Sequence, residues 1–116
     1  MDEDRLSADA LSAIGRAGAV RVSPISIFEI TQKVRVGKWP EMAPHAAGLV
    51  DQLEEQGAIS APFTNDVAYA AAAMDWDHRD PFDRILAATA IVGGFVLISA
   101  DGMFDTLDDT RLQRIW

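Results

Sequence analysis

The segment Asp80 to Gly102 restricts the folds open to this chain more than any other. It begins with Asp80-Pro81, which is typical of a helix start because aspartate caps a helix and proline suits its first turn. Gly93-Gly94 is typical of the helix end, and the apolar run Phe95 to Ser99 indicates a strand covered on both faces. Asp101-Gly102 predicts a turn. A helix leading directly into a buried strand predicts an α/β fold with a mostly parallel sheet.

The rest of the chain alternates in the same way. We expect helices at Ala8 to Ile14, Pro24 to about Val36, His45 to Gln56 and Thr64 or Asn65 to about Met74, and strands at Ala19 to Ser23, Ile59 to Phe63 and Leu112 to Trp116. In the third of these helices Leu49, Val50 and Leu53 are expected to face inward. A length of 116 residues predicts a single domain that can hold its own core.

Composition excludes several classes of protein. The absence of cysteine excludes disulfides, zinc ribbons, thiolate nucleophiles and iron–sulfur sites. No apolar run approaches the length of a membrane span, and the acidic opening Met1 to Asp4 has the wrong sign for a secretory signal, so we expect a cytoplasmic protein. A net charge of -8 argues against nucleic-acid binding through a broad positive surface. Carboxylates gathered at one point can instead hold a divalent cation that meets phosphate.

Three acidic positions have both a structural and a functional interpretation. Asp101 follows the predicted buried strand, at the sheet edge where ligands bind in parallel sheets, but Asp-Gly is also an ordinary turn. Asp80 is explained by capping, and Asp83 by the helix dipole of the first turn, although its apolar neighbours suggest a place near the core.

Glu29 lies in an apolar segment, Ile25 to Ile30. A capping box from Ser26 to Glu29 explains it locally. If Pro24 is the first helical residue, however, Ser23 is the cap and Glu29 stands inside the helix, where a carboxylate among isoleucines needs a cation or an arginine as partner.

Three segments in order resemble the PIN domain of VapC-type toxins. VSPISIFEITQKVRVGKW is similar to the family's strand-to-helix segment with its glutamate, HRDPFDRILAATA to its helix with an aspartate, and LISADGMF to its strand end with the Ser/Thr-x-Asp signature. The resemblance extends over residues 6 to 116. It implies a PIN-like three-layer α/β fold forming one domain over 1–116.

By this resemblance, Glu29, Asp83 and Asp101 are the catalytic cluster that holds Mg²⁺ or Mn²⁺. Ser99, Asp80 and Arg84 are the candidate supporting residues. The implied activity is metal-dependent hydrolysis of RNA by an activated water, the toxin component of a VapBC-type pair. The implied partners are RNA and a small VapB-like antitoxin. We also expect copies of the chain to associate, because a sheet that lacks its first strand has exposed edges. Arg84 and Arg79 can orient phosphate or an acidic partner, although solvated helix-start charges explain both; His45 and His78 are interpreted as surface residues.

One feature of the family has no counterpart in this sequence. The family begins with a central hydrophobic strand ending in an aspartate, and neither Asp2 nor Asp4 follows an apolar run. We expect this strand to be absent or replaced, through a shortened gene product or fragment, a segment exchanged with another copy, or degeneration. The last case gives the alternative function, a catalytically impaired PIN module that acts through protein binding. A phospho-receiver domain fits the length and alternation, but its paired acids and lysine are missing.

Overall fold

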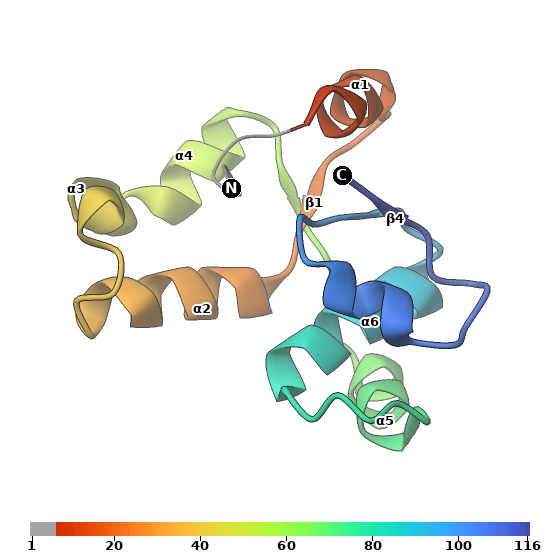
Figure 1. The fold of residues 1–116 in the computed structure, drawn as a ribbon. Helices are drawn as coiled ribbons and strands as arrows, with labels where there is room; N and C mark the ends of the chain where they lie inside the picture. The colour runs from red at the N-terminus through yellow and green to blue at the C-terminus, as the bar shows by residue number, and fades with distance from the viewer. Residues whose placement is uncertain (1–6) are drawn as a thin grey trace. The chain divides into compact units, whose positions relative to one another are not determined.

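The computed structural model describes residues 7–116, and these residues form a mixed α/β structure (Figure 1). This confirms the predicted α/β class. The chain divides into two compact units, the first comprising residues 7–18 and Phe63–Trp116 and the second comprising Ala19–Pro62. The expectation of an absent or replaced N-terminal strand concerns residues 1–6, which lie outside the described residues.

The first unit contains three long helices and a small parallel sheet. The helices are α1 (Ala8–Arg16), α5 (Asn65–Ala73) and α6 (Pro81–Gly93). The strands β3 (Leu97–Ile98) and β4 (Arg114–Ile115) pair in parallel, and the 3₁₀ helix η2 (Gly102–Thr106) lies between them in sequence. The predicted helix starts are confirmed at Ser7, Thr64 and Asp80, each of which accepts a hydrogen bond from a backbone N–H with its side chain.

Helices α5 and α6 pack together and supply most of the buried core of this unit (Figure 1). Val67 and Ala71 of α5 meet Ala88 of α6 in one cluster. A second cluster joins Trp76, Ala87, Phe104 and Leu107. Ala88 is fully buried against α5, where its small side chain lets the two helices approach closely, and Ala87 is fully buried in the second cluster. Gly94 ends α6 with φ 68°, a left-handed conformation that glycine adopts without a steric penalty.

The second unit carries α2 (Pro24–Arg35), η1 (Pro40–Met42), α3 (Ala43–Ala46), α4 (Leu49–Glu55), and the parallel strands β1 (Arg21–Val22) and β2 (Ile59–Ser60). The predicted helix from His45 to Gln56 is wrong in its first part. Ala47 and Gly48 separate α3 from α4, and Gly48 leaves the helical conformation with φ -100° and ψ 8°. Val50 is 52% exposed, so its predicted inward position is also wrong.

The parallel pairing is as predicted, but the strands are short and form two separate two-stranded sheets. Within residues 7–116 no strand pairs with both β1 and β3. The strand from Phe95 to Ser99 is also less covered than predicted, since Val96 is 46% exposed. In the part of the chain that the structure describes, none of the helices combines the length and the apolar character required to cross a membrane.

Candidate active site

The start of α6 positions two of the predicted site residues, Asp80 and Asp83. Pro81 occupies the first helical turn, and Asp80 Oδ1 accepts hydrogen bonds from the backbone N–H of Phe82 at 2.9 Å and of Asp83 at 3.4 Å. The capping interpretation of Asp80 is therefore confirmed. Asp83 stands in the first turn of the helix, where the helix dipole favours a negative charge.

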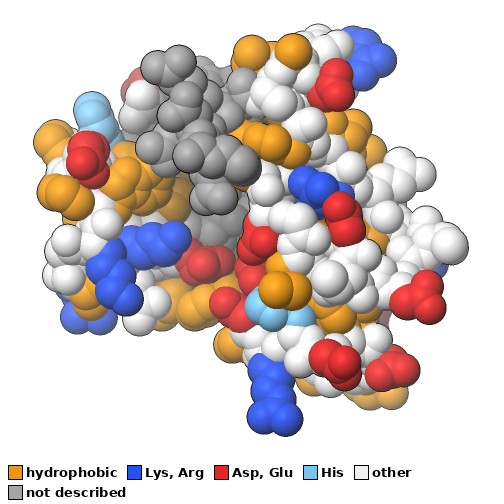
Figure 2. Space-filling view, viewed as in Figure 1, with side chains coloured by type: hydrophobic (Ala, Val, Ile, Leu, Met, Phe, Trp, Pro, Cys, Tyr) orange, Lys and Arg blue, Asp and Glu red, His pale blue; other side chains and the backbone are white. Residues whose placement is uncertain are grey.

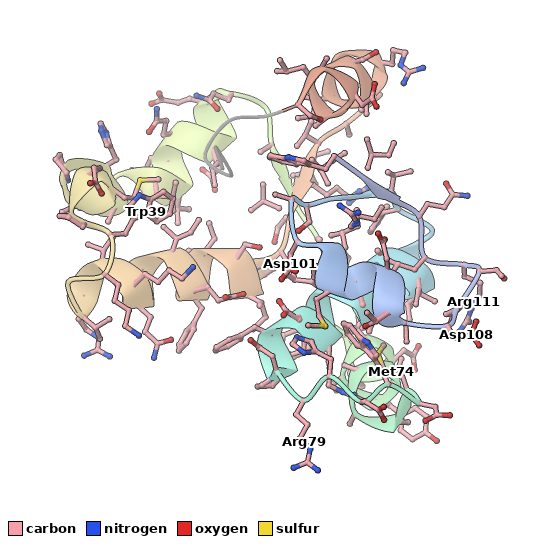
Figure 3. All side chains as sticks on the ribbon, in the orientation of Figure 1. Trp39, Met74, Arg79, Asp101, Asp108 and Arg111 are labelled. Atoms are coloured by element: carbon pink, nitrogen blue, oxygen red, sulfur yellow. The ribbon has the colours of Figure 1, made fainter. Side chains whose placement is uncertain are left out.

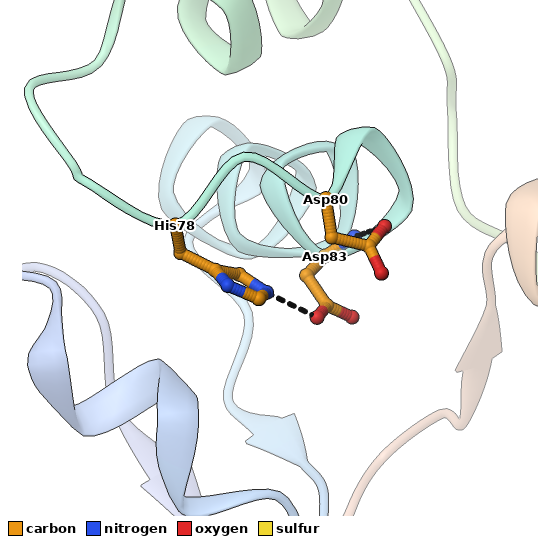
Figure 4. A group of neighbouring side chains, drawn as sticks. All are labelled: His78, Asp80 and Asp83. Atoms are coloured by element: carbon orange, nitrogen blue, oxygen red, sulfur yellow. Dashed lines mark hydrogen bonds and ion pairs between the residues drawn. The ribbon is translucent and has the colours of Figure 1, made fainter.

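Asp83 forms a hydrogen bond with His78, a residue that we did not predict to belong to the site. His78 Nε2 lies 2.6 Å from Asp83 Oδ2, and the two side chains are 22% and 18% exposed (Figure 4). The interpretation of His78 as a surface residue is wrong, because the connector from α5 to α6 turns its ring toward Asp83. His45 is exposed, as predicted. The only feature of the sequence that indicates this contact is the position of His78, two residues before the helix cap Asp80 and five residues before Asp83.

His78, Asp80 and Asp83 each offer one ligand atom, and these atoms lie within 4.8 Å of one another (Figure 4). Two carboxylates and one imidazole form a donor set that suits a divalent cation, since hard ions take carboxylate oxygens and imidazole also suits first-row transition metals. The partial burial of Asp83 strengthens its attraction for a cation. The residues present therefore fit a divalent metal ion.

Asp101 and Ser99 follow β3 in the first unit. Asp101 Oδ1 accepts a hydrogen bond from the N–H of Met103 at 2.9 Å and so caps η2, while Ser99 Oγ accepts one from the N–H of Asp101 at 3.1 Å. Asp101 is exposed at the end of the strand (Figure 3). The local turn interpretation is confirmed, and Asp101 is not a member of the His78 cluster. Its role as a metal ligand stays a prediction.

An ion pair supports the segment on which Asp101 lies. Arg114 of β4 donates to the Ser99 carbonyl at 2.9 Å and to both Asp105 oxygens at 2.9 and 2.7 Å. The hydrogen bonds to Asp105, and to a smaller extent the charge of Asp101, raise the pKa of Arg114. A permanent positive charge therefore lies beside the end of β3 and offsets the neighbouring acidic side chains.

Glu29 lies on α2 in the second unit. Ser23 Oγ accepts a hydrogen bond from the N–H of Ile25 at 3.1 Å, and Pro24 begins the helix. The capping-box interpretation is therefore wrong, because Ser26 is already inside the helix, and the alternative interpretation with Ser23 as cap is confirmed. Glu29 is half-buried. Its convergence with Asp83 and Asp101 stays a prediction.

Arg84, next to Asp83, is committed to backbone carbonyls. Its guanidinium N–H groups donate to five carbonyl oxygens at 2.6 to 3.3 Å, those of Ala71, Ala72, Met74, Trp76 and His78. The interpretation as a solvated charge is wrong for Arg84. It holds for Arg79, which is exposed and points away from α6 (Figure 3). Because the described contacts use all three Arg84 nitrogens, a role in holding the connector is favoured over phosphate binding.

The sequence matches the PIN domain family over residues 1–109. No curated protein and no solved structure matches the chain significantly. The match covers the start of α2, the start of α6 and the end of β3, which are the three segments that carry the predicted acidic residues.

Proposed function

This chain belongs to the PIN domain family, whose members are generally metal-dependent nucleases, and we propose that it is an endoribonuclease of the VapC toxin type, acting as one PIN-like domain. The observation that carries the proposal is the half-buried Asp83 at the start of α6, which lies beside the Asp80 carboxylate and is hydrogen-bonded to His78, in a group of side chains that fits a divalent cation. The reaction is hydrolysis of an RNA phosphodiester bond.

The metal is Mg²⁺ or Mn²⁺, held by Asp83, Asp101 and Glu29, with Asp80 and Ser99 in support. When bound, such an ion lowers the pKa of a coordinated water and stabilises charge on the phosphate. The protein's own contribution is to fix the carboxylates. Asp83 lies in the first turn of α6, and Glu29 lies on α2. Asp101 is held by its hydrogen bond to the Ser99 hydroxyl and by its position as the cap of η2.

RNA contact is supported by a small basic group in an otherwise acidic chain. Lys and Arg side chains gather over the C-terminal end of α2, where Lys33 and Arg35 lie in the last turn and Lys38 follows (Figure 2). All three are exposed. Such side chains bind the RNA backbone through phosphate, independently of sequence.

The proposed protein partner is a small VapB-like antitoxin. Exposed apolar side chains in the second unit support a protein partner, since Val36, Val50 and Phe28 are each about half exposed. Homo-oligomerisation is also proposed, because two-stranded sheets as short as these are marginal in isolation and further strand pairing stabilises them. The site of action is the cytoplasm.

A cleavage assay on structured RNA tests the proposed activity. We expect cleavage that requires Mn²⁺ or Mg²⁺, stops with chelator, and is abolished by Asp101→Asn and by Glu29→Gln. Asp108→Asn, which changes another exposed aspartate of the first unit, is the matched control and is expected to cleave normally. Metal-independent cleavage, or full activity of Asp101→Asn, contradicts the proposal; absence of any cleavage favours a PIN module that acts by protein binding.

A further inference from the structure

The contact between His78 and Asp83 restricts one oxygen of the proposed metal ligand. An ionised carboxylate can only accept hydrogen bonds, so the N–H at His78 Nε2 donates to Asp83 Oδ2 across 2.6 Å. The terminal torsion of an aspartate is otherwise broad. The imidazole therefore selects one orientation of the carboxylate and leaves Oδ1 free of this bond.

His78 is itself held from two sides. The Arg84 guanidinium binds the carbonyls of Trp76 and His78 at 2.8 and 3.0 Å, which fixes the backbone of the connector. The indole ring of Trp76, which is buried, lies 4.9 Å from the His78 ring between centroids. Trp76 in turn donates to Thr106 Oγ1 at 2.8 Å. The His78 imidazole therefore has a fixed backbone and a ring contact with Trp76 in addition to its hydrogen bond with Asp83.

We propose that His78 is a positioning residue for Asp83, orienting the carboxylate toward a divalent cation without itself ligating the ion. The inference rests on the proposed function. Removal of the hydrogen-bond partner behind a ligand commonly lowers metal affinity by about 10- to 100-fold. His78 has the geometry of such a partner, because it bonds one carboxylate oxygen and is anchored by Arg84 and Trp76.

Mn²⁺ titration of the full chain by calorimetry tests the proposal with three changes at His78. Glutamine places an amide N–H where Nε2 lies, whereas asparagine is one methylene shorter and phenylalanine keeps only the ring. We expect Mn²⁺ affinity to fall about 10-fold in His78→Phe and His78→Asn and to stay within about threefold of wild type in His78→Gln. His45→Phe, at an exposed histidine, is the matched control and should bind as wild type.

If His78→Asn binds Mn²⁺ as tightly as wild type, His78 does not position Asp83. If His78→Gln binds Mn²⁺ as weakly as His78→Asn, the positioning role is also overturned, because the His78 Nε2 atom then serves as a metal ligand. Asp83→Asn separates this failure from that of the proposed function. If Asp83→Asn loses Mn²⁺ but the His78 variants do not, only the positioning role fails. If Asp83→Asn binds as wild type, Asp83 is not a ligand and both proposals fail. Thermal unfolding of each variant checks that the fold is retained.

Discussion

Trp76 and Thr106 join two segments that flank the candidate site. The Trp76 Nε1–H donates to Thr106 Oγ1 at 2.8 Å, and Thr106 Oγ1 donates to the Met103 carbonyl at 2.6 Å. The Thr106 hydroxyl thus links the segment between α5 and α6, which carries His78, to η2, which begins after Asp101. The Trp76 ring also packs against Phe104, with centroids 6.0 Å apart.

Thr106→Val should lower the free energy of unfolding by about 1 to 2 kcal/mol, because it leaves the buried indole N–H without its acceptor. Thr106→Ser keeps the hydroxyl and should cost less. Urea denaturation followed by tryptophan fluorescence measures both. Thr110→Val, at an exposed threonine nearby in sequence, is the control. Equal stability of Thr106→Val and wild type would show that this hydrogen bond contributes nothing.

Arg84→Ala should lower the free energy of unfolding by about 3 kcal/mol, because carbonyls at the end of α5 and along the connector lose a charged donor. Arg79→Ala removes an exposed arginine from the same connector and should change the free energy of unfolding by less than about 0.5 kcal/mol. Chemical denaturation of the two variants in parallel measures the difference. Similar values for the two would refute the role of Arg84 as a clamp on the connector.

The basic group at the end of α2 should govern the salt dependence of RNA binding. Replacing Lys33, Arg35 and Lys38 by glutamine should lower the slope of log affinity against log salt concentration by about 2, since each phosphate contact to single-stranded RNA contributes about 0.7. Fluorescence anisotropy at several salt concentrations measures the slope. Arg16→Gln, on α1, is the control. An unchanged slope in the triple variant means that RNA binds elsewhere.

The ion pair between Asp109 and Arg111 predicts a stability difference that depends on pH. Hydrogen bonds from Arg111 lower the pKa of Asp109 from 3.8 to about 2. A lowered native pKa means that the stabilisation is full above the ordinary pKa and is lost as the pH falls through the native one. Asp109→Asn should therefore be less stable than wild type at neutral pH, by a small amount because Arg111 is largely exposed and solvent screens the pair.

Melting temperatures of wild type and Asp109→Asn, measured from neutral pH down to the native pKa of Asp109, check this prediction. The two curves should converge at the acid end. Asp108→Asn, at the preceding residue, is the control, because it removes one negative charge but leaves the ion pair between Asp109 and Arg111 intact. A difference that grows as the pH falls would contradict the predicted direction.

The local features of the fold were predictable from the sequence. Ser23, Thr64 and Asp80 cap helices through bonds to residues two or three positions away, so short patterns contain the information. The parallel direction of β1 and β2, which are linked by helices, agrees with the predicted alternation of helix and strand. The position of Gly94 at the end of α6 followed from its permitted left-handed conformation.

Features that depend on distant contacts were not predictable. Periodicity placed Val50 inward, but burial depends on what lies opposite the helix, and half of the side chain is exposed. His78 lies in an irregular connector whose path depends on Arg84, so no helical or strand pattern places its ring against Asp83. The acidic triad rests on family resemblance, and the ligand roles of Glu29, Asp83 and Asp101 all stay predictions.

The assignment of Asp83 as a metal ligand is tested most directly by single-turnover RNA cleavage in Mn²⁺, comparing Asp83→Asn with wild type and Asp108→Asn. Loss of a metal ligand removes several kcal/mol of transition-state stabilisation, so we expect Asp83→Asn to cleave about 100-fold or more slowly than wild type. Asp108→Asn should cleave at the wild-type rate. Cleavage by Asp83→Asn at the wild-type rate would contradict the assignment of Asp83 as a metal ligand of a PIN nuclease.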